Sequence, residues 1–411
     1  MKKGKKNIIV LGSGFAAFSF LKKLNKNLFY VTVVSKRNHF LFTPLLPQTT
    51  VGTIEFRSII EPVRNQHKIQ FIQAECKTID SDNNFIVCED IDTKKTFILN
   101  FDILVIAVGE VTNTYKIPGV SENALFLKEL SDARNIRNRV IDCFENASLP
   151  GLSKAEKQKF LTFVVCGGGP TGVEFVAELH DFIEDVKKKY GNIAKLVSIY
   201  LIEAKENILS SFDETLSRYT MKIFRRKKII IKTSSYVTSV TNDQIILNDS
   251  TTIEYGLLVW ATGNSPTSLI KNSHFQKSGN GKILVDRYLR VKKDVSKFCD
   301  NIFAIGDCAT IENQELPATA QIAQQQGYFL AKCFNNPKAI NEFIPRKFGM
   351  LAYIGDNKAL ADTTFFKSSC FLTFLFWRTV YLTKLVSLKN KILVLFDWFK
   401  TILWGRDISN F

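Results

Sequence analysis

The stretch "NIIVLGSGFAAFSFLKKL", residues 7–24, and the stretch "FVVCGGGPTGVEFVAELHDF", residues 163–182, repeat one pattern. Each begins with a β-branched run typical of a buried strand, continues through a glycine-rich turn and ends in an amphipathic helical pattern. In this context the first glycine makes the tight turn, the second lets the backbone approach a pyrophosphate, and a third small residue packs the helix against the strand. The phosphate then lies at the helix N-terminus. The sequence therefore predicts an α/β fold with two Rossmann-like dinucleotide-binding domains.

These two turns supply the first candidate binding residues. They are Gly12, Gly14, Phe15 and Ala17 in the first stretch, and Gly167, Gly169, Pro170, Thr171 and Gly172 in the second. One such pattern alone is weak, but two copies, each between a strand and a helix, are strong support for nucleotide binding. The alternative is a pair of glycine-rich turns that bind nothing.

The residue after the second strand of each unit contacts the ribose of a bound dinucleotide. After "VSIYLI" this residue is Glu203, whose carboxylate can accept from both ribose hydroxyls and would repel a 2′-phosphate. This favours NADH over NADPH at the second turn. After "FYVTVV" the chain has Ser35 and then Lys36, so the ribose must be held there by Ser35 or by backbone groups. We therefore expect FAD at the first turn.

Other strand ends carry small residues that would let the chain pass under a dinucleotide. They are Ala107 and Gly109 in "VIAVGE", Ala261, Thr262 and Gly263 in "VWATGN", and Gly306 in "IFAIGDCA". Asp307 follows Gly306 and leaves two interpretations open. An acid at this strand end can hold ribityl hydroxyls of a flavin, or it can cap a following helix.

Composition and charge set wider bounds. With 411 residues, 45% hydrophobic and 23% charged, the chain is long enough for two to three domains and too apolar for disorder as its main state. The formal net charge of +16 suits nucleic acid or an anionic membrane surface, but much of it is Lys spread along the chain, which solubility also explains. Charge alone decides nothing, and we predict no nucleic-acid partner.

Cysteine, histidine and terminal patterns exclude further classes. The eight cysteines and four histidines are scattered, without the spacing of a metal site, so we expect no metal and reduced thiols in a reducing compartment. The N-terminal "MKKGKKNIIVLGSG" enters a strand almost at once, so we expect no signal peptide or long presequence. No apolar run reaches 18 residues, so we expect no membrane-spanning helix.

Several blocks, in order over nearly the whole chain, resemble the alternative (type II) NADH:quinone oxidoreductases. They are "RNHFLFTPLLPQTTVGTIEFRSIIEPVR", "GGGPTGVEFVAEL", "VWATGN", "IFAIGDCA", "ATAQIAQQQG" and "LAYIGDNKALAD". The segment "LPGLSKAEKQKFLTFVVCGGG" is similar to mitochondrial members. The resemblance implies a glutathione-reductase-like flavoprotein with bound FAD and with NADH as substrate.

The resemblance also implies roles for single residues. The segment Thr43, Pro44 and Leu45 would lie beside the isoalloxazine ring. Glu174 would lie near the point where nicotinamide meets flavin, although an acid that complements the dipole of its helix fits the local sequence equally well. By the same resemblance, Gly306 and Asp307 would hold the ribityl and phosphate region.

The stretch "LPATAQIAQQQGYFLAKCF", residues 316–334, should be a helix after Pro317, because Ala and Gln are good helix formers. Gln321 and Gln324 are three residues apart and share one face, where their amides could donate to a quinone carbonyl. Ala320 and Ala323 keep the helix slim for a planar quinone. The resemblance implies that this helix faces the second side of the flavin, with Ala320 and Gln321 at the FAD, and that Gln321 faces the quinone head group. Many relatives carry His at position 324. The alternative is an ordinary polar helix.

The segment 365–411 is dense in Phe, Leu and Trp but interrupted by Lys and Arg, as in a helix that lies in a membrane interface. One helical stripe is apolar, with Asp397 and Lys400 on the other side. The stripe is Ile392, Leu395, Phe396, Phe399, Ile402 and Leu403. We expect the tryptophans Trp377, Trp398 and Trp404 at the headgroup level and the lysines Lys384, Lys389, Lys391 and Lys400 near anionic lipid. A homodimer contact, or burial on the protein body, is the alternative, and both can hold.

Together these features predict an FAD-binding domain of residues 1–118 and 281–345, an NADH-binding domain of residues 119–280, and a membrane-docking segment of residues 346–411. The expected activity is non-proton-pumping transfer from NADH through FAD to a membrane quinone. The expected location is peripheral on a mitochondrial inner membrane or in a related organelle, or else on the cytoplasmic face of a bacterial plasma membrane. A sulfide:quinone oxidoreductase, which needs paired redox cysteines at the flavin, and a non-catalytic flavoprotein scaffold are the alternatives.

Overall fold

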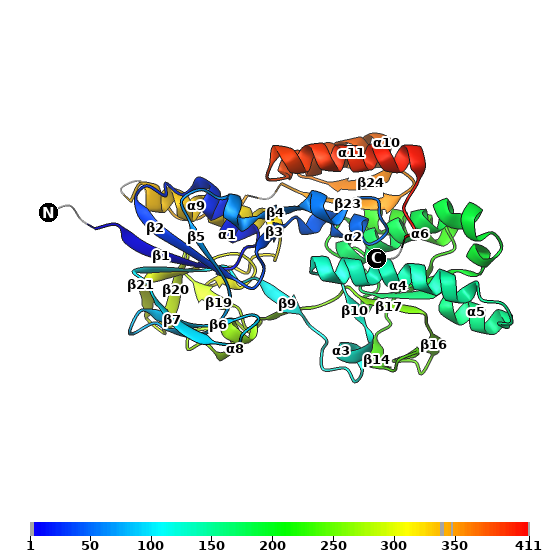
Figure 1. The fold of residues 1–411 in the computed structure, drawn as a ribbon, viewed down its shortest axis with the longest axis horizontal. Coiled ribbons are helices and arrows are strands. Elements are labelled where there is room, and N and C mark those ends of the chain that lie inside the picture. Colours follow the sequence, from blue (N-terminus) through cyan, green and yellow to red (C-terminus); the bar gives the residue numbers. More distant parts are fainter. Residues whose placement is uncertain (1–3, 338–340, 347, 410–411) are drawn as a thin grey trace. The chain divides into compact units, whose positions relative to one another are not determined.

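The computed structural model describes residues 4–337, 341–346 and 348–409, and these form two compact α/β units (Figure 1). The first unit comprises Met1–Leu41, Ile60–Val111 and Asn264–Arg346, and the second comprises Phe42–Ile59, Thr112–Gly263 and Lys347–Phe411. Each unit contains one of the two glycine-rich turns. The predicted fold class, two Rossmann-like units with helices at the C-terminal end, is confirmed. Residues 410 and 411, at the end of the predicted membrane-docking segment, lie outside the described residues.

The first unit is built on a ten-stranded sheet in the order β22-β19-β20-β21-β8-β1-β2-β5-β6-β7. Its strands are β1 (Lys6–Leu11), β2 (Phe29–Ser35), β5 (Gln70–Asp80), β6 (Phe85–Asp90), β7 (Thr96–Asn100), β8 (Ile103–Ile106), β19 (Ile283–Val285), β20 (Arg290–Asp294), β21 (Lys297–Ala304) and β22 (Ala309–Ile311). The central strands β21, β8, β1, β2 and β5 are parallel, so their carboxyl ends meet at one edge of the sheet. Smaller elements are β3 (His39–Leu41), β4 (Ile60–Pro62), β9 (Glu110–Thr112), β18 (Asn264–Pro266) and α8 (Ser268–Asn272).

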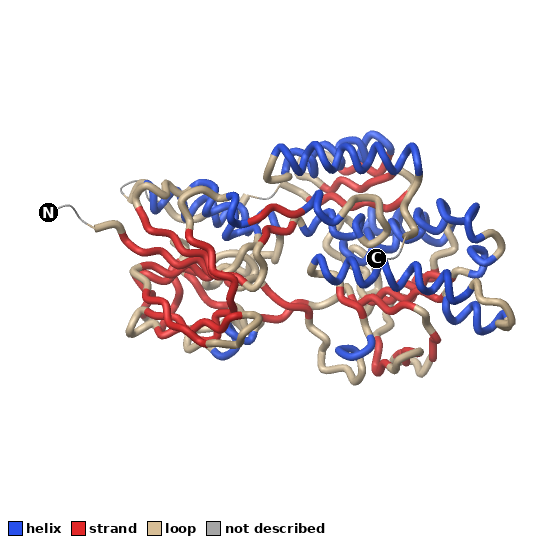
Figure 2. Tube along the Cα trace, viewed as in Figure 1, coloured by secondary structure: helices blue, strands red, loops and turns tan. Residues whose placement is uncertain are grey.

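Two helices, α1 (Phe15–Lys23) and α9 (Ala320–Asn335), pack side by side in this unit, on the same side of the sheet in Figure 2. Small residues allow the close approach. A Cβ added to Gly327 on α9 would lie 2.3 Å from the carbonyl oxygen of Ala16 on α1, so any side chain there would force the helices apart. Ala323 is also buried and lies toward Gly306. Its small size suits this close approach, and the predicted role of leaving room for a quinone stays a prediction.

The second unit has a five-stranded parallel sheet in the order β10-β17-β11-β12-β13. These strands are β10 (Leu125–Phe126), β11 (Thr162–Cys166), β12 (Ser198–Ile202), β13 (Ile230–Lys232) and β17 (Leu257–Trp260), and a small antiparallel sheet adds β14 (Val237–Val240), β15 (Gln244–Leu247) and β16 (Thr252–Glu254). The helices are α2 (Leu46–Thr49), α3 (Val120–Asn123), α4 (Leu130–Ala147), α5 (Lys154–Phe160), α6 (Pro170–Tyr190) and α7 (Glu214–Arg226). The long α6 begins directly after the second glycine-rich turn.

The C-terminal segment of this unit begins with a sheet that the sequence analysis did not anticipate. Three antiparallel strands, β23 (Met350–Gly355), β24 (Lys358–Asp362) and β25 (Lys367–Cys370), come first. The helices α10 (Phe371–Lys384) and α11 (Leu388–Trp404) follow, side by side above β24 in Figure 1. No helix in the described part of the chain is long and apolar enough to cross a bilayer.

Helix α11 buries a mixed face of Asn390, Val394, Asp397 and Trp398 and turns its apolar stripe outward. The six residues of the predicted stripe are all exposed, whereas Asp397 is only 5% exposed. Two predictions for this segment are wrong, because Trp377 and Trp398 are buried in the unit and only Trp404 reaches the surface. Lys400, which was expected near anionic lipid, instead binds within the protein, since its ammonium donates to Glu55 at 2.8 Å. The helix therefore combines the predicted exposed stripe with the alternative of one face buried on the body.

Candidate functional site

The first glycine-rich turn has no room for a side chain at Gly12. Gly12 has φ +106°, its N–H donates to the Val34 carbonyl at 2.8 Å, and a Cβ there would lie 2.3 Å from the carbonyl oxygen of Ala107. The turn thus joins the carboxyl ends of β1, β2 and β8. Gly14 caps α1, and no heavy atom of the described residues lies within 4 Å of a Cβ built on it. The space over this helix N-terminus is open to a phosphate.

Gly306 follows the end of strand β21 and is held by Gln326 of α9. The Gly306 N–H donates to Gln326 Oε1 at 2.6 Å, and the Gln326 side chain is 1% exposed. Within the described residues, the other end of this amide, Nε2, has no hydrogen-bond acceptor. A buried donor without an acceptor is costly, so this position fits a ligand that offers acceptor atoms. FAD is such a ligand, and these residues fit it.

Asp307 follows β21 in a turn that leads to strand β22, not to a helix. The alternative in which Asp307 caps a following helix is therefore wrong. The side chain is half-buried, beside the buried Gly306.

The ribose-side residue of the first unit, Ser35, is tied to the turn itself. Its hydroxyl donates to Ser13 Oγ at 3.0 Å, and Ser13 is the middle residue of the Gly12–Gly14 turn. Ser13 in turn donates to the carbonyl of His39 at 3.1 Å. Lys36 points elsewhere, because its ammonium pairs with Glu75 at 2.7 Å. Of the two predicted ribose-side residues, Ser35 is at the turn and Lys36 is engaged on β5.

The second glycine-rich turn repeats the geometry of the first. Gly167 has φ +115°, its N–H donates to the Ile202 carbonyl at 2.8 Å, and a Cβ would lie 2.6 Å from the carbonyl oxygen of Ala261. Gly172 packs α6 onto this turn, since a Cβ there would lie 1.9 Å from the Gly167 carbonyl oxygen. Gly169 again has open space where its Cβ would be, within the described residues. The structure therefore brings the predicted residues of the second turn together.

Its neighbours fit the same arrangement. Pro170 is the first residue of α6, where a missing N–H costs nothing, and Thr171 is exposed beside it. Thr262 and Gly263 continue from Ala261 beyond β17. Gly263 has φ +77° and lies against the ring of Tyr115. A Cβ built on Gly263 would lie 2.7 Å from the hydroxyl oxygen of Tyr115.

Glu203 follows β12 and is fixed by backbone donors of the second turn. Its Oε2 accepts from the Gly168 N–H at 2.6 Å, and its Oε1 accepts from the Lys205 N–H at 2.9 Å. Each carboxylate oxygen keeps a second lone-pair direction for a ribose hydroxyl. Gly168 corresponds in position to Ser13. The two turns therefore have the same backbone geometry but differ in the side chain that hydrogen-bonds to the middle residue, which is Ser35 in the first turn and Glu203 in the second.

Glu174 lies in the second turn of α6 and is buried, 6% exposed. The helix-dipole alternative is therefore wrong, because no acid stands in the first turn of this helix. Its Oε1 accepts from the Tyr353 N–H of β23 at 3.0 Å. Burial raises the pKa of Glu174 to about 8, against the opposing effect of that N–H, and the neighbouring charge of Glu178 raises it further. The carboxyl group is thus able to hold a proton at neutral pH.

The glutamine helix forms as predicted, from Ala320 onward. Thr319 caps it by accepting from the Ile322 N–H at 3.3 Å, and Gln321 and Gln324 are both half-buried. The two following amides hold the unit together: Gln325 exchanges two hydrogen bonds with the backbone of Arg346, and Gln326 binds Gly306. Gln326 was not among the predicted site residues, although it stands in the same polar run.

Thr43, Pro44 and Leu45 form a short 3-10 turn that belongs to the second unit and leads directly into α2.

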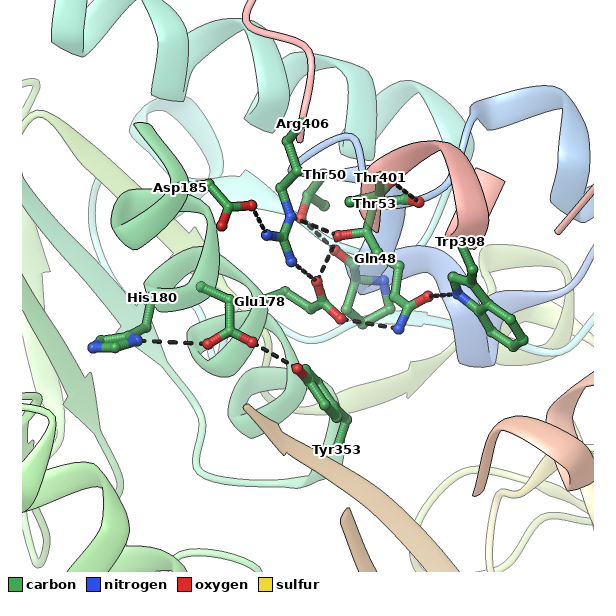
Figure 3. A network of polar contacts seen from close by, with 12 residues as sticks. Gln48, Thr50, Thr53, Glu178, His180, Asp185, Tyr353, Trp398, Thr401 and Arg406 are labelled. Carbon is green, nitrogen blue, oxygen red and sulfur yellow. Dashed lines mark hydrogen bonds and ion pairs between the residues drawn. The ribbon is translucent and has the colours of Figure 1, made fainter. Parts of the chain in front are cut away.

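The polar cluster beside α2 has no counterpart in the sequence analysis. Glu178 accepts hydrogen bonds from Gln48, Thr53 and Arg406, and Figure 3 shows these side chains converging on it. The only local signal was an acid on the otherwise apolar face of the α6 pattern.

One cluster in the described residues has metal-ligand types: His180, Asp181 and Asp356. The ammonium of Lys227 lies 3.4 Å from the Asp181 carboxylate and 3.1 Å from that of Asp356. The positive charge of Lys227 thus already balances these two acids.

Comparison with known proteins places this geometry in a class. The pyridine nucleotide-disulphide oxidoreductase family matches residues 6–327, and the NDH2 C-terminal domain matches residues 348–407. A protein of Dictyostelium discoideum named "Probable NADH dehydrogenase" is 46% identical, with 100% of this chain and 93% of that protein covered. The "External NADH-ubiquinone oxidoreductase 2, mitochondrial" of Saccharomyces cerevisiae is 38% identical, with 98% and 82% covered. The solved structure of NDH2 from Plasmodium falciparum in complex with NADH matches with a TM-score of 0.94 and 32% identity, over 99% of this chain and 100% of that chain.

Two glycine-rich turns in two Rossmann-like units define a pyridine nucleotide-dependent flavoprotein oxidoreductase. Within that class, the chain belongs to the type II NADH dehydrogenase family.

The buried Glu174 carboxyl should make the stability of the chain depend on pH. Its folded pKa of about 8 lies above its ordinary value of 4.5, so its protonation stabilises the fold fully below pH 4.5, and this contribution is lost as the pH rises to about 8. Glu174→Gln keeps an acceptor for the Tyr353 N–H and cannot ionise. Relative to the parent, its free energy of unfolding should increase with pH across that window, by up to ~1.4 kcal/mol per pH unit, and then level off. Its melting temperature should rise relative to the parent's over the same window. Thermal unfolding of both chains at a series of pH values measures this, and a difference that does not vary with pH would contradict it.

Proposed function

We propose that this chain is a non-proton-pumping NADH:quinone oxidoreductase, with FAD bound by the first unit and NADH by the second. When bound, FAD would accept a hydride from NADH and pass two electrons to a quinone. The observation that carries the proposal is the pair of turns with one backbone geometry and different ribose-side groups, a neutral Ser35 and an acidic Glu203. The yeast relative, named as an NADH-ubiquinone oxidoreductase, and the Plasmodium NDH2 structure with NADH support it.

In the first unit, Gly12 and Gly14 would admit the pyrophosphate, with Ala17 packing α1 behind it. Ala107, Gly109 and Gly306 would give the cofactor close access to the backbone at the neighbouring strand ends. Asp307 would bind ribityl hydroxyls, and the free Nε2 of Gln326 would donate to a cofactor acceptor. We further assign Phe15, Thr43, Pro44 and Leu45 to contacts with this cofactor.

In the second unit, Gly167, Gly169 and Gly172 would hold the pyrophosphate of NADH at the N-terminus of α6, with Pro170 and Thr171 beside it. Glu203 would bind the ribose, and Ala261, Thr262 and Gly263 would line the same strand ends. Glu174 would act next to the nicotinamide, as a group that holds a proton at neutral pH. For the quinone, we assign Ala320, Gln321 and Gln324 at the start of α9, where neutral amides suit an uncharged substrate.

The surface of α10 and α11 would dock the enzyme on a bilayer that contains the quinone. Leu372 of α10, Phe365 and Trp404 are exposed, as is the stripe of α11. Exposed apolar surface of this extent marks an interaction site. Lys384 and Lys389 are exposed at its margin, where anionic lipid headgroups would attract them. The same face leaves area for a contact between two copies of the chain.

We assign the protein to the surface of a mitochondrial inner membrane or of a related organelle. The named mitochondrial relatives of yeast and plants favour that location over a bacterial plasma membrane.

A sulfide:quinone oxidoreductase is the weaker alternative. All eight cysteines are free thiols, and the one that follows Gly306 is Cys308, which donates to the backbone carbonyls of Ile106 and Ile305. Burial raises the pKa of Cys308 to about 12, so its thiol is a poor nucleophile. A non-catalytic flavoprotein scaffold is the other alternative, and turnover of NADH separates it from the proposal.

The visible spectrum of the purified protein tests the function directly. NADH should bleach the flavin band within one turnover, and a short-chain quinone should restore it. In Gln321→Leu the bleaching should be unchanged, while the return of the band slows by ~10-fold, because a donor to the quinone carbonyl is lost. A colourless protein that cannot be reconstituted with FAD would sink the proposal, and equal slowing of both phases would remove Gln321 from the quinone site.

The carboxylate of Glu203 should set the preference for NADH. Glu203→Gln removes the negative charge that repels a 2′-phosphate, so the ratio of kcat/KM for NADH to that for NADPH should fall by on the order of tenfold. Lys205→Gln is a suitable control, because only its backbone N–H contacts Glu203. If the ratio is unchanged in Glu203→Gln, this residue does not contact the ribose.

Membrane docking should depend on the exposed phenylalanines of α11. Phe396→Glu with Phe399→Glu should remove ~3–6 kcal/mol of apolar burial in lipid and abolish co-sedimentation with liposomes that contain anionic lipid. Ile98→Glu with Val295→Glu makes the same chemical change at two exposed apolar residues of the first unit and should bind liposomes normally. Dye reduction by NADH should persist in both. Normal sedimentation of the Phe396/Phe399 variant would exclude this face from docking.

A further inference from the structure

The carboxamide of Gln48 is fixed at both of its ends. Its Nε2 donates to Glu178 Oε1 on α6 at 2.9 Å, and its Oε1 accepts from the indole Nε1 of Trp398 on α11 at 2.9 Å. All three side chains are more than nine-tenths buried, and Figure 3 shows Gln48 between the other two. A single amide therefore links α2, α6 and the C-terminal helix.

The Glu178 end of this link is a buried carboxylate with three donors. Besides Gln48, Thr53 Oγ1 donates to it at 2.7 Å and Arg406 Nη2 at 3.2 Å. Burial raises the pKa of Glu178 and the guanidinium of Arg406 opposes that shift. Because all three partners donate, the ionised form fits the geometry. This charge orients the Gln48 amide, so its oxygen has to face Trp398.

The Trp398 end belongs to a helix that also organises the chain after Gln48. Asp397 accepts from the Glu55 N–H at 3.0 Å and from the Ser58 hydroxyl at 2.6 Å. Asn390 donates to the Ser58 carbonyl at 2.9 Å. The inner face of α11 thus supplies hydrogen bonds along the segment 48–58.

Gln48 lies three residues after Leu45, in the short α2 helix that continues the 3-10 turn Thr43–Leu45. The hydroxyls of Thr49 and Thr50 bond to backbone carbonyls inside the same turn, at 2.8 and 2.5 Å, and do not reach other elements. Gln48 is therefore the polar side chain of α2 that sets the direction of the turn against α6 and α11.

We propose that Gln48 is a positioning residue for quinone reduction, which couples the seating of α11 to the orientation of Thr43–Leu45. The inference rests on the proposed function, in which Thr43–Leu45 contacts the flavin and the outer face of α11 meets the bilayer. Helix α11 is the one element that carries both the apolar outer stripe and the donor to Gln48. Movement of α11 on docking would then reach the flavin-side turn through two hydrogen bonds.

Two conservative substitutions break the link, one at both ends and one at the Trp398 end only. Gln48→Met keeps the length of the side chain and removes both bonds, while Trp398→Phe keeps a ring in the same pocket and removes the indole donor. Both variants, their double combination and the parent are assayed on quinone-containing liposomes and, separately, with a soluble dye. We expect kcat/KM for quinone to fall by ~5–10-fold in each single variant, with dye reduction unchanged. The double variant should be no worse than Gln48→Met, because the bond that Trp398→Phe removes is already absent in Gln48→Met.

Lys400→Gln is the matched control. It removes a hydrogen bond between α11 and the same segment, through Glu55, and leaves both bonds of Gln48 intact. It should keep the parent's quinone activity. An equal loss in Lys400→Gln, additive losses in the double variant, or parallel losses of dye and quinone activity would overturn the proposal in favour of a general structural role. If the parent oxidises no NADH with either acceptor, the proposed function fails instead, which the parent assay alone reveals.

Discussion

The carboxyl group of Glu178, buried in the second unit among hydrogen-bond donors, is the constraint on which the arrangement of that unit depends. A charge held in a protein interior costs several kcal/mol unless donors and an opposite charge surround it. Glu178 obtains them from Gln48 and Thr53, about 130 residues earlier, and from Arg406, 228 residues later. The chain must therefore bring its C-terminal end back onto α6. Arg406 also pairs with Asp185 on the same helix, which secures the end of the chain after α11.

This constraint explains why α11 has polar groups on its inner face. A helix on a soluble protein usually buries its apolar stripe. Here Asn390, Asp397 and Trp398 face the protein and each makes a hydrogen bond to the segment 48–58, so the inner contact is specified by polar groups. The apolar stripe is not needed for the fold of the unit and remains exposed. If the outer face meets lipid as proposed, these directional bonds would keep α11 joined to the segment 48–58, so that a shift of the helix is passed on to that segment.

The local geometry of the two glycine-rich turns could be predicted from the sequence, because it follows from backbone constraints within a few residues. Gly12 and Gly167 adopt the positive φ and the close strand contact that their position in the pattern implies. The buried tryptophans and the Gln48 cluster could not be predicted, since each depends on partners far away in the sequence. The C-terminal sheet did leave a local signal. The stretch "YIGDNKAL" places Asp356 and Asn357, both with positive φ, between two alternating apolar runs, as in a tight hairpin.

In the proposed function, one backbone geometry would serve two nucleotides because the group bound to the middle residue of each turn differs. In the first unit the Ser35 hydroxyl donates to Ser13 and adds no charge near the phosphates. Affinity for the cofactor would then come from backbone groups and from buried amides such as Gln326. In the second unit the Gly168 N–H holds the acidic side chain of Glu203, which is proposed to meet the ribose. A carboxylate there binds hydroxyls and repels phosphate, which limits the choice of nucleotide without requiring tight binding. The first turn is thus suited to a resident cofactor, and the second to a substrate that must leave after every turnover.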